Sequence, residues 1–274
     1  MPRVGSRFPT ITYTKINRFE SCRKWYWFQY LSGRELPPEK ERTPANVVGN
    51  GVHGALRKLC LTGDPDDARA DLDAYLRMPL HECAGPGTEA HEEAFVFLER
   101  GIEAHASIDS ANRWAELKCE AESRRHQVRA WAAIDRVDQL RDGSWQLIDW
   151  KTGRWDEGEK TDQQLDIYHV IARTARRIHK TETVTTIGWN LRTNTQRVRV
   201  LTRDDAVATL NYLGGIARRL RELTEFEANP GGQCGFCPWR EQCPDAAAGA
   251  PTIESWLDDE EDDDGLVAEA AIEG

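Results

Sequence analysis

The sequence predicts an α/β fold in which helices precede, interrupt and follow a group of strands. Apolar residues recur at spacings of three and four along Glu89 to Ile108, as they do on one face of a helix. After Trp114 the pattern changes to the alternation that is typical of strands, first over Leu117 to Glu122 and then over Val128 to Leu140. Trp145 to Trp150 follows as a compact apolar run typical of a buried strand. The middle of the chain therefore reads as helix, three strands, helix and further strands.

The first part of the chain is predicted to be mostly helical. Thr10 to Leu31 is a helix-rich stretch dense in aromatic residues. Thr43 has the character of an N-cap, with Pro44 at the first helical position, and the helix that it opens is expected to end near Gly63. Asp66 to Met78 shows a further helical pattern. These helices are expected to precede the sheet.

The remaining elements follow turn and capping signals. Leu117 to Glu122 alternates as a strand does, and Asp142-Gly143 is a hairpin turn signal between the next two strands. Thr193-Asn194 is expected to turn between two later strands. The elements expected after the hairpin are a helix over Thr161–His179, strands over Val184–Leu191 and Gln196–Thr202, and a last helix, capped by Asp204 or Asp205, that ends near Leu223.

Composition predicts a soluble, cytoplasmic protein. The mean hydropathy is −0.65, and no apolar run approaches the roughly 18–20 residues of a membrane span. The first residues lack the hydrophobic segment of a signal peptide. Seven cysteines are an odd number for a disulfide framework and favour a reducing compartment. We therefore expect no membrane partner.

The net charge of −10 comes from the end of the chain. Ten of the 46 acidic residues lie between Glu254 and Gly274, where there is no Lys or Arg, which leaves 36 acidic residues against 36 basic ones. Residues 249–274 are therefore expected to form an acidic disordered tail. A neutral body can still contain a basic channel, so the overall charge does not exclude a nucleic-acid partner.

Four cysteines lie near the two ends of the sequence. Cys234, Cys237 and Cys243 have two and then five residues between them, and Cys22 lies near the start. Thiolates at this spacing converge on a metal ion or an iron–sulfur cluster, and a structural zinc site would use the same ligands. The aromatic residues around Cys22 are explained by core packing or by base stacking. The other cysteines are expected to be plain buried thiols: Cys60, Cys83 and Cys119.

A second group of residues has the character of a hydrolytic metal site. Asp149 and Lys151 are two apart at the end of a strand, so their side chains leave the same face. Asp135 lies on the neighbouring predicted strand. Two carboxylates suit Mg²⁺ or Mn²⁺, and a lysine beside the cation can orient or deprotonate an attacking water. A surface ion pair between Asp149 and Lys151 is the alternative explanation.

The order of these motifs resembles the RecB-like branch of the PD-(D/E)xK nuclease superfamily. Gly49-x3-His53, Asp135, Asp149-x-Lys151 and Gln164-x3-Tyr168 follow one another as in that branch. With the cysteines included, the chain looks most like the iron–sulfur group of AddB-type nuclease domains and CRISPR-associated Cas-four exonucleases. The resemblance covers residues 16–244. It implies a restriction-endonuclease-like core, with a central mixed sheet flanked by helices, a helical N-terminal region and a C-terminal iron–sulfur staple.

The resemblance also implies residue roles. His53, Asp135, Asp149 and the main-chain carbonyl of Trp150 would bind the catalytic Mg²⁺ or Mn²⁺, and Lys151 would be the catalytic lysine. Gln164 and Tyr168 would support the site and the DNA backbone. The four outer cysteines would hold a 4Fe–4S cluster: Cys22, Cys234, Cys237 and Cys243.

Other residues remain open on the sequence alone. Asp138 is assigned to a salt bridge or turn contact rather than to metal binding. Glu120 and Glu122 share a strand face and either could contribute to the site. The four-residue spacing of Gln164 and Tyr168 is also explained by helix packing.

These observations predict a metal-dependent DNA exonuclease that acts on single-stranded ends, in recombination, repair, phage replication or CRISPR adaptation. Proteins of such pathways are its expected partners, and a homo-oligomer is left open. The alternative is a non-catalytic DNA-end-binding subunit, or a zinc-stapled binding module. The predicted division is an aromatic-rich segment over 1–42, a nuclease domain over 43–225 with a helical insertion at about 64–112, a cluster-binding segment over 226–248, and the acidic tail.

Overall fold

The computed structural model describes residues 8–37, 43–153, 159–175, 178 and 183–246. Two compact units make up the chain. Among the described residues, the first consists of 17–37 and 224–246, and the second of 8–16 and 43–223. The expected acidic tail lies outside the described residues.

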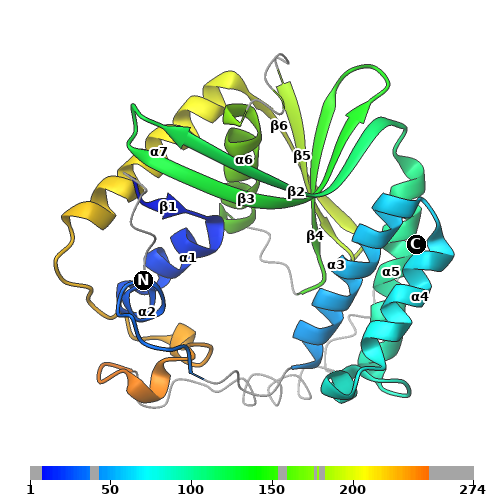
Figure 1. The fold of residues 1–274 in the computed structure, drawn as a ribbon, viewed down its shortest axis with the longest axis horizontal. Coiled ribbons are helices and arrows are strands. Elements are labelled where there is room, and N and C mark those ends of the chain that lie inside the picture. The colour runs from blue at the N-terminus through cyan, green and yellow to red at the C-terminus, as the bar shows by residue number, and fades with distance from the viewer. Residues whose placement is uncertain (1–7, 38–42, 154–158, 176–177, 179–182, 247–274) are drawn as a thin grey trace, which may run out of the picture. The chain divides into compact units, whose positions relative to one another are not determined.

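The second unit contains a six-stranded mixed sheet with strand order β1-β3-β4-β5-β6, in which β2 also pairs with β3. The β1–β3 and β4–β5 pairs are parallel, and the other pairs are antiparallel. The expected α/β fold with a mixed sheet flanked by helices is therefore confirmed (Figure 1). The strands are β1 (Thr10–Ile11), β2 (Ser110–Ser123), β3 (Val128–Leu140), β4 (Trp145–Lys151), β5 (Thr183–Asn190) and β6 (Thr195–Thr202).

The long strand β3 has three partners, and this arrangement positions the candidate site. β2 pairs with it over almost its whole length. β1 pairs with it at Arg129 and Ala130, whereas β4 pairs with it only over Arg136–Gln139. β4 then continues beyond this ladder as far as Lys151 and pairs with β5. The end of β4 thus leaves β3 while it remains fixed on its other side.

The helices of the second unit form two groups. α3 (Pro44–Thr62), α4 (Pro65–Leu76) and α5 (Glu89–Ser107) pack together, with the short 3₁₀ helix η1 (Pro79–Ala84) beside them (Figure 1). α6 (Glu159–Thr174) connects the parallel strands β4 and β5 and packs beside α7 (Arg203–Glu222). Such a crossover is the usual connection between neighbouring parallel strands.

The core of the second unit lies between α3, α4, α5 and the sheet. It joins apolar residues of these helices to buried residues from the ends of β4 and β5, such as Ile148, Trp150 and Trp189. Thr43 caps α3 through its hydroxyl, which accepts a hydrogen bond from the Asn46 amide, and Pro44 starts the helix as expected. Burial of this apolar face fixes α3 against the sheet.

Three local predictions were wrong. Thr202, rather than Asp204 or Asp205, is the N-cap of α7, because its hydroxyl accepts from the Asp205 amide while the Asp205 carboxylate accepts from the Thr202 amide. The helix expected to reach His179 ends at Thr174. Strand β2 also begins seven residues before the expected Leu117, because its cross-strand pairing with β3 extends back to Ser110.

The first unit contains α2 (Arg23–Tyr30) and the 3₁₀ helices η2 (Gly232–Cys234) and η3 (Arg240–Gln242). Cys22 directly follows α1 (Tyr13–Ser21) and is the N-cap of α2, with an extended backbone. The rings of Phe28 and Trp239 stack with centroids 5.4 Å apart, and Trp25 completes a small buried core. Most of the aromatic residues of this segment therefore serve core packing.

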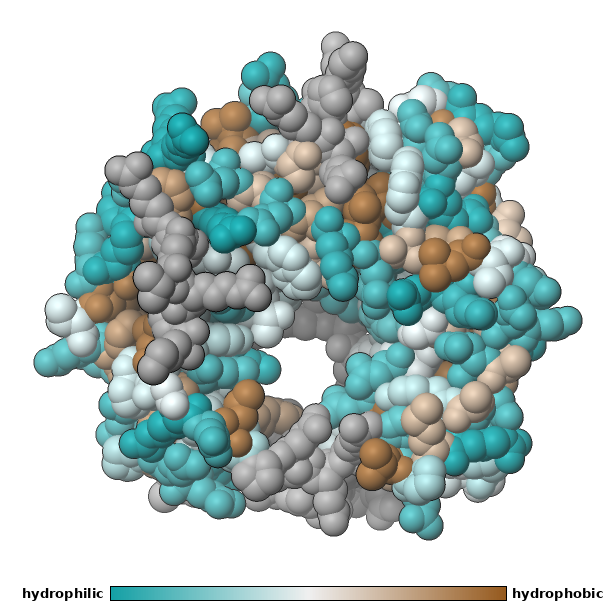
Figure 2. Space-filling view, viewed as in Figure 1, coloured by the Kyte–Doolittle hydropathy of each residue, from teal (hydrophilic) through white to brown (hydrophobic). Residues whose placement is uncertain are grey.

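Hydrophilic residues predominate on the face shown in Figure 2, where hydrophobic ones are scattered. Within the described residues, no helix has both the length and the apolar character of a membrane span.

Candidate active site

The candidate site lies where β4 separates from β3. The last paired residues of the β3–β4 ladder at this end are Arg136 and Ile148. One residue further along β3, Oδ2 of Asp135 accepts a hydrogen bond of 2.9 Å from the amide of Trp150. Where β4 diverges from β3, the Trp150 amide thus donates to the Asp135 carboxylate instead of to a main-chain carbonyl of β3. This contact places Asp135 next to the Asp149–Lys151 segment.

Asp149 and Lys151 form a close pair at the end of β4. Nζ of Lys151 lies 2.6 Å from Oδ2 of Asp149, and the aspartate side chain is 5% exposed while the lysine side chain is 32% exposed. The ammonium group therefore reaches from a buried carboxylate towards solvent. Because the two residues are two apart on one strand, their side chains share a face, as expected.

Gln164 of α6 joins this pair to Tyr168. The Gln164 amide nitrogen donates to Oδ1 of Asp149 at 2.9 Å and to the hydroxyl of Tyr168 at 2.7 Å. Its carbonyl oxygen accepts from Nζ of Lys151 at 2.7 Å. Both Gln164 and Tyr168 are buried. The four-residue spacing lets Tyr168 hydrogen-bond to Gln164, which itself contacts Asp149 and Lys151.

His53 approaches Asp135 from α3. Its Nδ1 lies 3.4 Å from Oδ2 of Asp135. Gly49, one turn earlier, has no side chain, and a Cβ at that position would lie only 3.1 Å from Oγ1 of Thr152, directly after β4. The glycine of the Gly49-x3-His53 pattern thus permits the close approach of α3 to the end of β4.

The electrostatics of these groups are coupled. Burial raises the pKa of Asp149; the charge of Lys151 opposes this increase, and that of Asp135 adds to it. Burial would lower the pKa of His53, but the carboxylates of Asp135 and Asp149 outweigh burial, so the pKa of His53 is raised. Burial, together with the charges of Asp149 and Asp135, raises the pKa of Tyr168 well above its ordinary value. Two carboxylates thus share a partly buried space that favours an added positive charge.

The donor set suits a hard divalent cation. Oδ2 of Asp149 is buried, and Lys151 is its charged neighbour at 2.6 Å without a well-directed hydrogen bond. Carboxylate oxygens with an imidazole nitrogen nearby are ligands that Mg²⁺ and Mn²⁺ accept. Within the described residues, however, no three His, Cys, Asp or Glu side chains are already arranged around one position that an ion could occupy.

The open candidates lie elsewhere. Asp138 is fully buried and pairs with Arg136 at 2.6 Å and Arg113 at 3.1 Å, in agreement with the salt bridge assigned to it. Glu120 pairs with Arg129, and Glu122 lies 4.0 Å from Arg124. Neither glutamate contacts the network around Asp149.

Sequence reasoning missed one ion pair beside the site. Nε of Arg57 lies 3.0 Å from Oε2 of Glu116. Arg57 is one helical turn after His53 on α3, and this spacing was a signal that could have identified it. Glu116 gave no such signal, because it precedes the region that alternation marked as a strand.

The four outer cysteines line one small cavity of about 20 Å³ in the first unit. Burial is the main cause that raises the pKa of Cys237 to about 11, and the proximity of Cys22, Cys243 and Cys234 adds to it. The Asn229 amide donates to Sγ of Cys22 at 3.4 Å. Four thiols, the donor type that iron–sulfur clusters and zinc use, thus line one space, although in the described part of the chain they are not arranged around one ion position. Cys60 and Cys83, expected to be buried, are half-buried and exposed, and only Cys119 is buried.

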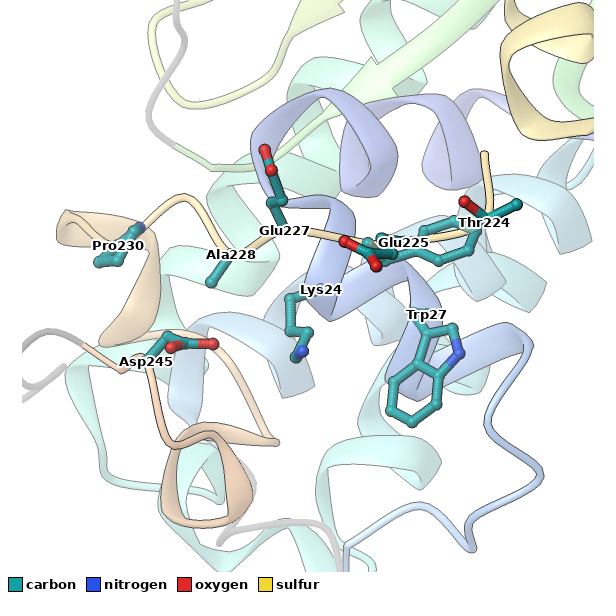
Figure 3. A pocket seen from close by; sticks show the side chains of 9 residues that line it. Lys24, Trp27, Thr224, Glu225, Glu227, Ala228, Pro230 and Asp245 are labelled. Atoms are coloured by element: carbon teal, nitrogen blue, oxygen red, sulfur yellow. The ribbon is translucent and has the colours of Figure 1, made fainter. Parts of the chain in front are cut away.

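A larger cavity of about 600 Å³ also lies in the first unit (Figure 3). Lys24 and Trp27 of α2 line it together with the chain segment from Thr224 to Ala228, Pro230 and Asp245. Its charged groups are three carboxylates and one ammonium: Glu225, Glu227, Asp245 and Lys24. This excess of negative charge does not suit a phosphate ligand.

A family model described as the PD-(D/E)XK nuclease superfamily matches residues 10–244. No curated protein matches the chain. Among solved structures, 31 chains match. One of them, titled "Crystal structure of SSO0001", is 15% identical in sequence and has a TM-score of 0.36. The match covers 82% of this chain and 95% of the other chain. A TM-score this low does not establish a shared fold.

The family model spans most of the sequence, from β1 to the residue after the last cysteine of the trio. It therefore includes both the mixed sheet with its acidic site and the four-cysteine cavity. The chain belongs to the PD-(D/E)XK nuclease superfamily, a family of nucleases that usually depend on Mg²⁺ or Mn²⁺.

Proposed function

We propose that this protein is a metal-dependent DNA exonuclease that hydrolyses phosphodiester bonds from single-stranded ends and contains a structural 4Fe–4S cluster. One observation carries the nuclease part of the proposal. Asp149, Lys151 and Gln164 form a closed network of contacts between 2.6 and 2.9 Å, immediately beside the Asp135–His53 pair. Two carboxylates and an ammonium group at one end of a sheet are the groups that phosphodiester hydrolysis needs.

Asp135, Asp149, His53 and the carbonyl of Trp150 would hold Mg²⁺ or Mn²⁺. The bound ion would supply Lewis-acid stabilisation of charge on the phosphate and would lower the pKa of a water molecule. Burial raises the pKa of Asp149 and the charge of Asp135 adds to the increase, so a nearby cation would favour the charged form of this carboxylate.

Lys151 would orient the attacking water and stabilise the negative charge that develops on the phosphate oxygens. The contacts of its ammonium group with Asp149 and Gln164 hold this group in position before substrate arrives. Tyr168, hydrogen-bonded to Gln164, would restrict the rotation of the glutamine amide. Preorganisation of this kind lowers the reorganisation needed during the reaction.

Three parts of the proposal rest on the resemblance to RecB-like iron–sulfur nucleases. These are the preference for single-stranded ends, exonucleolytic cleavage, and a role in recombination, repair, phage replication or CRISPR adaptation in the cytoplasm. The buried positions of Trp25, Tyr26 and Phe28 leave those rings unavailable for stacking on bases.

The cluster assignment is supported by the convergence of Cys22 with the late cysteine trio on one cavity. An amide donor to a cysteine sulfur, as at Cys22, is a contact that tunes and stabilises iron–sulfur clusters. The role proposed for the cluster is structural: it would staple α2 to the segment that follows Thr224.

The nuclease proposal is tested on protein purified without oxygen. Single-stranded DNA labelled at its 5′ or 3′ end is incubated with Mg²⁺ or Mn²⁺ and compared between wild type and Lys151→Ala. Wild type should shorten the DNA progressively, and the variant should be at least about 100-fold slower. Arg77→Ala is the control and should cut at the wild-type rate, because Arg77 is an exposed basic residue directly after α4 and is paired with Asp73. Equal rates for wild type and Lys151→Ala would refute the proposed site.

The cluster proposal is tested by metal analysis of the same preparation. About four iron and four sulfide per chain, with broad visible absorption that Cys237→Ser abolishes, are expected. A colourless protein with stoichiometric zinc would refute the cluster and would show that the four cysteines form a zinc site instead.

A further inference from the structure

Arg57 and Glu116 form an ion pair that the proposed mechanism does not use. Arg57 follows His53 by four residues on α3, which places the two side chains on one helix face about 6 Å apart along the axis. Their partners are likewise neighbours. In the β2–β3 ladder Ala115 pairs with Arg136 and Leu117 with Ile134, so Glu116 lies opposite Asp135.

Two parallel contacts therefore join α3 to the sheet. His53 reaches Asp135 on β3, and one turn later Arg57 reaches Glu116 on β2. The guanidinium group of Arg57 thus lies one helical turn beyond the His53 contact and is directed to β2.

Stability does not explain this second pair. The side chains of Arg57 and Glu116 are 52% and 48% exposed, and ion pairs at such exposure contribute about 0–1 kcal/mol. Glu116 also has φ = 44° within a strand. A left-handed backbone is unfavourable for a glutamate, and strain of this kind is frequent at functional sites.

Arg57 also offers a positive charge that could bind a phosphate group. Lys151 is already held by Asp149 and Gln164, whereas Arg57 is half exposed and its planar guanidinium can bind two oxygens of one phosphate. The site otherwise presents the carboxylates of Asp135 and Asp149, which repel a polyanionic strand.

We infer that Arg57 binds a backbone phosphate of the nucleic-acid strand next to the one that is cut, and that Glu116 holds the guanidinium in place until the phosphate displaces it. The inference rests on the proposed nuclease function, whose substrate it positions. Arg57 is a binding and positioning residue, and the chemical step belongs to the network around Asp149.

The test measures the binding of fluorescent single-stranded DNA in EDTA, where no cutting occurs, over a range of salt concentrations. Arg57→Ala should bind about tenfold more weakly at low salt. The slope of log affinity against log salt should become shallower by about 0.7, the value for one phosphate contact to a single strand. Arg57→Lys should keep the slope and recover part of the affinity. Glu116→Gln should bind more tightly than wild type, because it frees the guanidinium group.

Arg77→Ala is the matched control, because Arg77 directly follows α4, is 59% exposed and is paired with Asp73 of that helix at 2.7 Å. It should match wild type in affinity and slope. In Mg²⁺, Arg57→Ala should raise KM while kcat changes less.

The two proposals fail separately. If Arg57→Ala keeps the affinity and salt slope of wild type, the role of Arg57 is refuted whether or not the protein cuts DNA. If wild type binds DNA with the expected contrast between variants but cuts none with Mg²⁺ or Mn²⁺, the nuclease proposal fails and the binding role stands. Absence of DNA binding by wild type in EDTA would overturn the role of Arg57, while cutting with Mg²⁺ or Mn²⁺ would still decide the nuclease proposal.

Discussion

Two aspartates of β3, Asp135 and Asp138, lie three residues apart in opposite environments. Asp138 is fully buried, and its carboxylate accepts hydrogen bonds from Arg136, Arg113 and Ser110. Asp135 is 22% exposed, accepts from the Trp150 amide and lies 3.4 Å from His53. The charge of Asp138 is thus balanced by two arginines of the chain, whereas Asp135 and Asp149 together exceed the positive charge of Lys151.

The nearby histidines show the same contrast. Burial, with the charges of Arg113 and Arg136, lowers the pKa of His105 to about 4 in the cluster around Asp138. In the candidate site the carboxylates raise the pKa of His53. One cluster is therefore complete within the chain, and the other is suited to an additional cation. The predictions below test this difference.

The largest expected effect is on catalysis. Asp149→Asn should lower the rate of single-stranded DNA cleavage by about 100- to 1,000-fold, because it removes a proposed metal ligand and the partner of Lys151. Its stability in EDTA should stay within about 1 kcal/mol of wild type, since the charge of Lys151 can still reach solvent. Single-turnover rates and urea unfolding measure the two quantities. A large loss of stability with little loss of rate would show that Asp149 is structural, as Asp138 is expected to be.

Asp138→Asn should show the opposite behaviour. It leaves Arg136 buried without a counter-charge, and breaking a buried pair in this way costs about 3–5 kcal/mol. The matched variant Asp135→Asn should cost less than about 1 kcal/mol in EDTA. Urea unfolding of the two variants decides the matter. Equal losses would show that Asp135 is as structural as Asp138.

Divalent metal should stabilise only a protein with both site carboxylates. At a concentration 100 times its Kd, Mg²⁺ or Mn²⁺ should add about 2.7 kcal/mol to the unfolding free energy of wild type. Asp149→Asn should lose most of this gain. Thermal or urea unfolding with and without metal provides the measurement, and an equal gain in the variant would place the metal elsewhere.

The smallest effect concerns pH. The folded-state pKa of His105, about 4, lies below the ordinary 6.5, so its contribution to stability is present above pH 6.5 and is lost as pH falls towards 4. The contribution of His53, whose pKa is raised, is present below pH 6.5 and is lost as pH rises through the raised pKa.

For His105 the loss is on the order of 1–3 kcal/mol. His105→Gln should flatten the pH dependence of unfolding between pH 4 and 6.5. In NMR titration without metal, His105 should titrate near pH 4 and His53 above 6.5. If His105 and His53 titrated at the same pH, the contrast in charge between the two clusters would be contradicted.

Local patterns predicted most elements, and tertiary contacts changed some of their ends. The cap of α3 by Thr43 and Pro44 was readable because a capping residue and its helix are adjacent in sequence. The start of β2 at Ser110 was not, because the first part of this strand lacks regular alternation and is defined by its pairing with β3. The cap of α7 was misassigned because several consecutive residues there can cap a helix, and only the backbone geometry selects Thr202.

The sequence by itself determined which residues are available for chemistry and which of them share an element. Asp149 and Lys151 had to share a strand face, and Gln164 and Tyr168 a helix face, because strand and helix periods are fixed by the backbone. The motif order was sufficient to indicate the superfamily, to which the chain belongs. The catalytic and cluster roles of the individual residues stay predictions.

Only the tertiary structure decided how these elements meet. It separated Asp135 from Asp138 by supplying arginines to one carboxylate and an amide with a histidine to the other. It also brought Glu116 opposite Asp135 and beside Arg57. Such contacts join residues that are distant in the chain, and they depend on strand register and on the packing of α3, which no local period encodes.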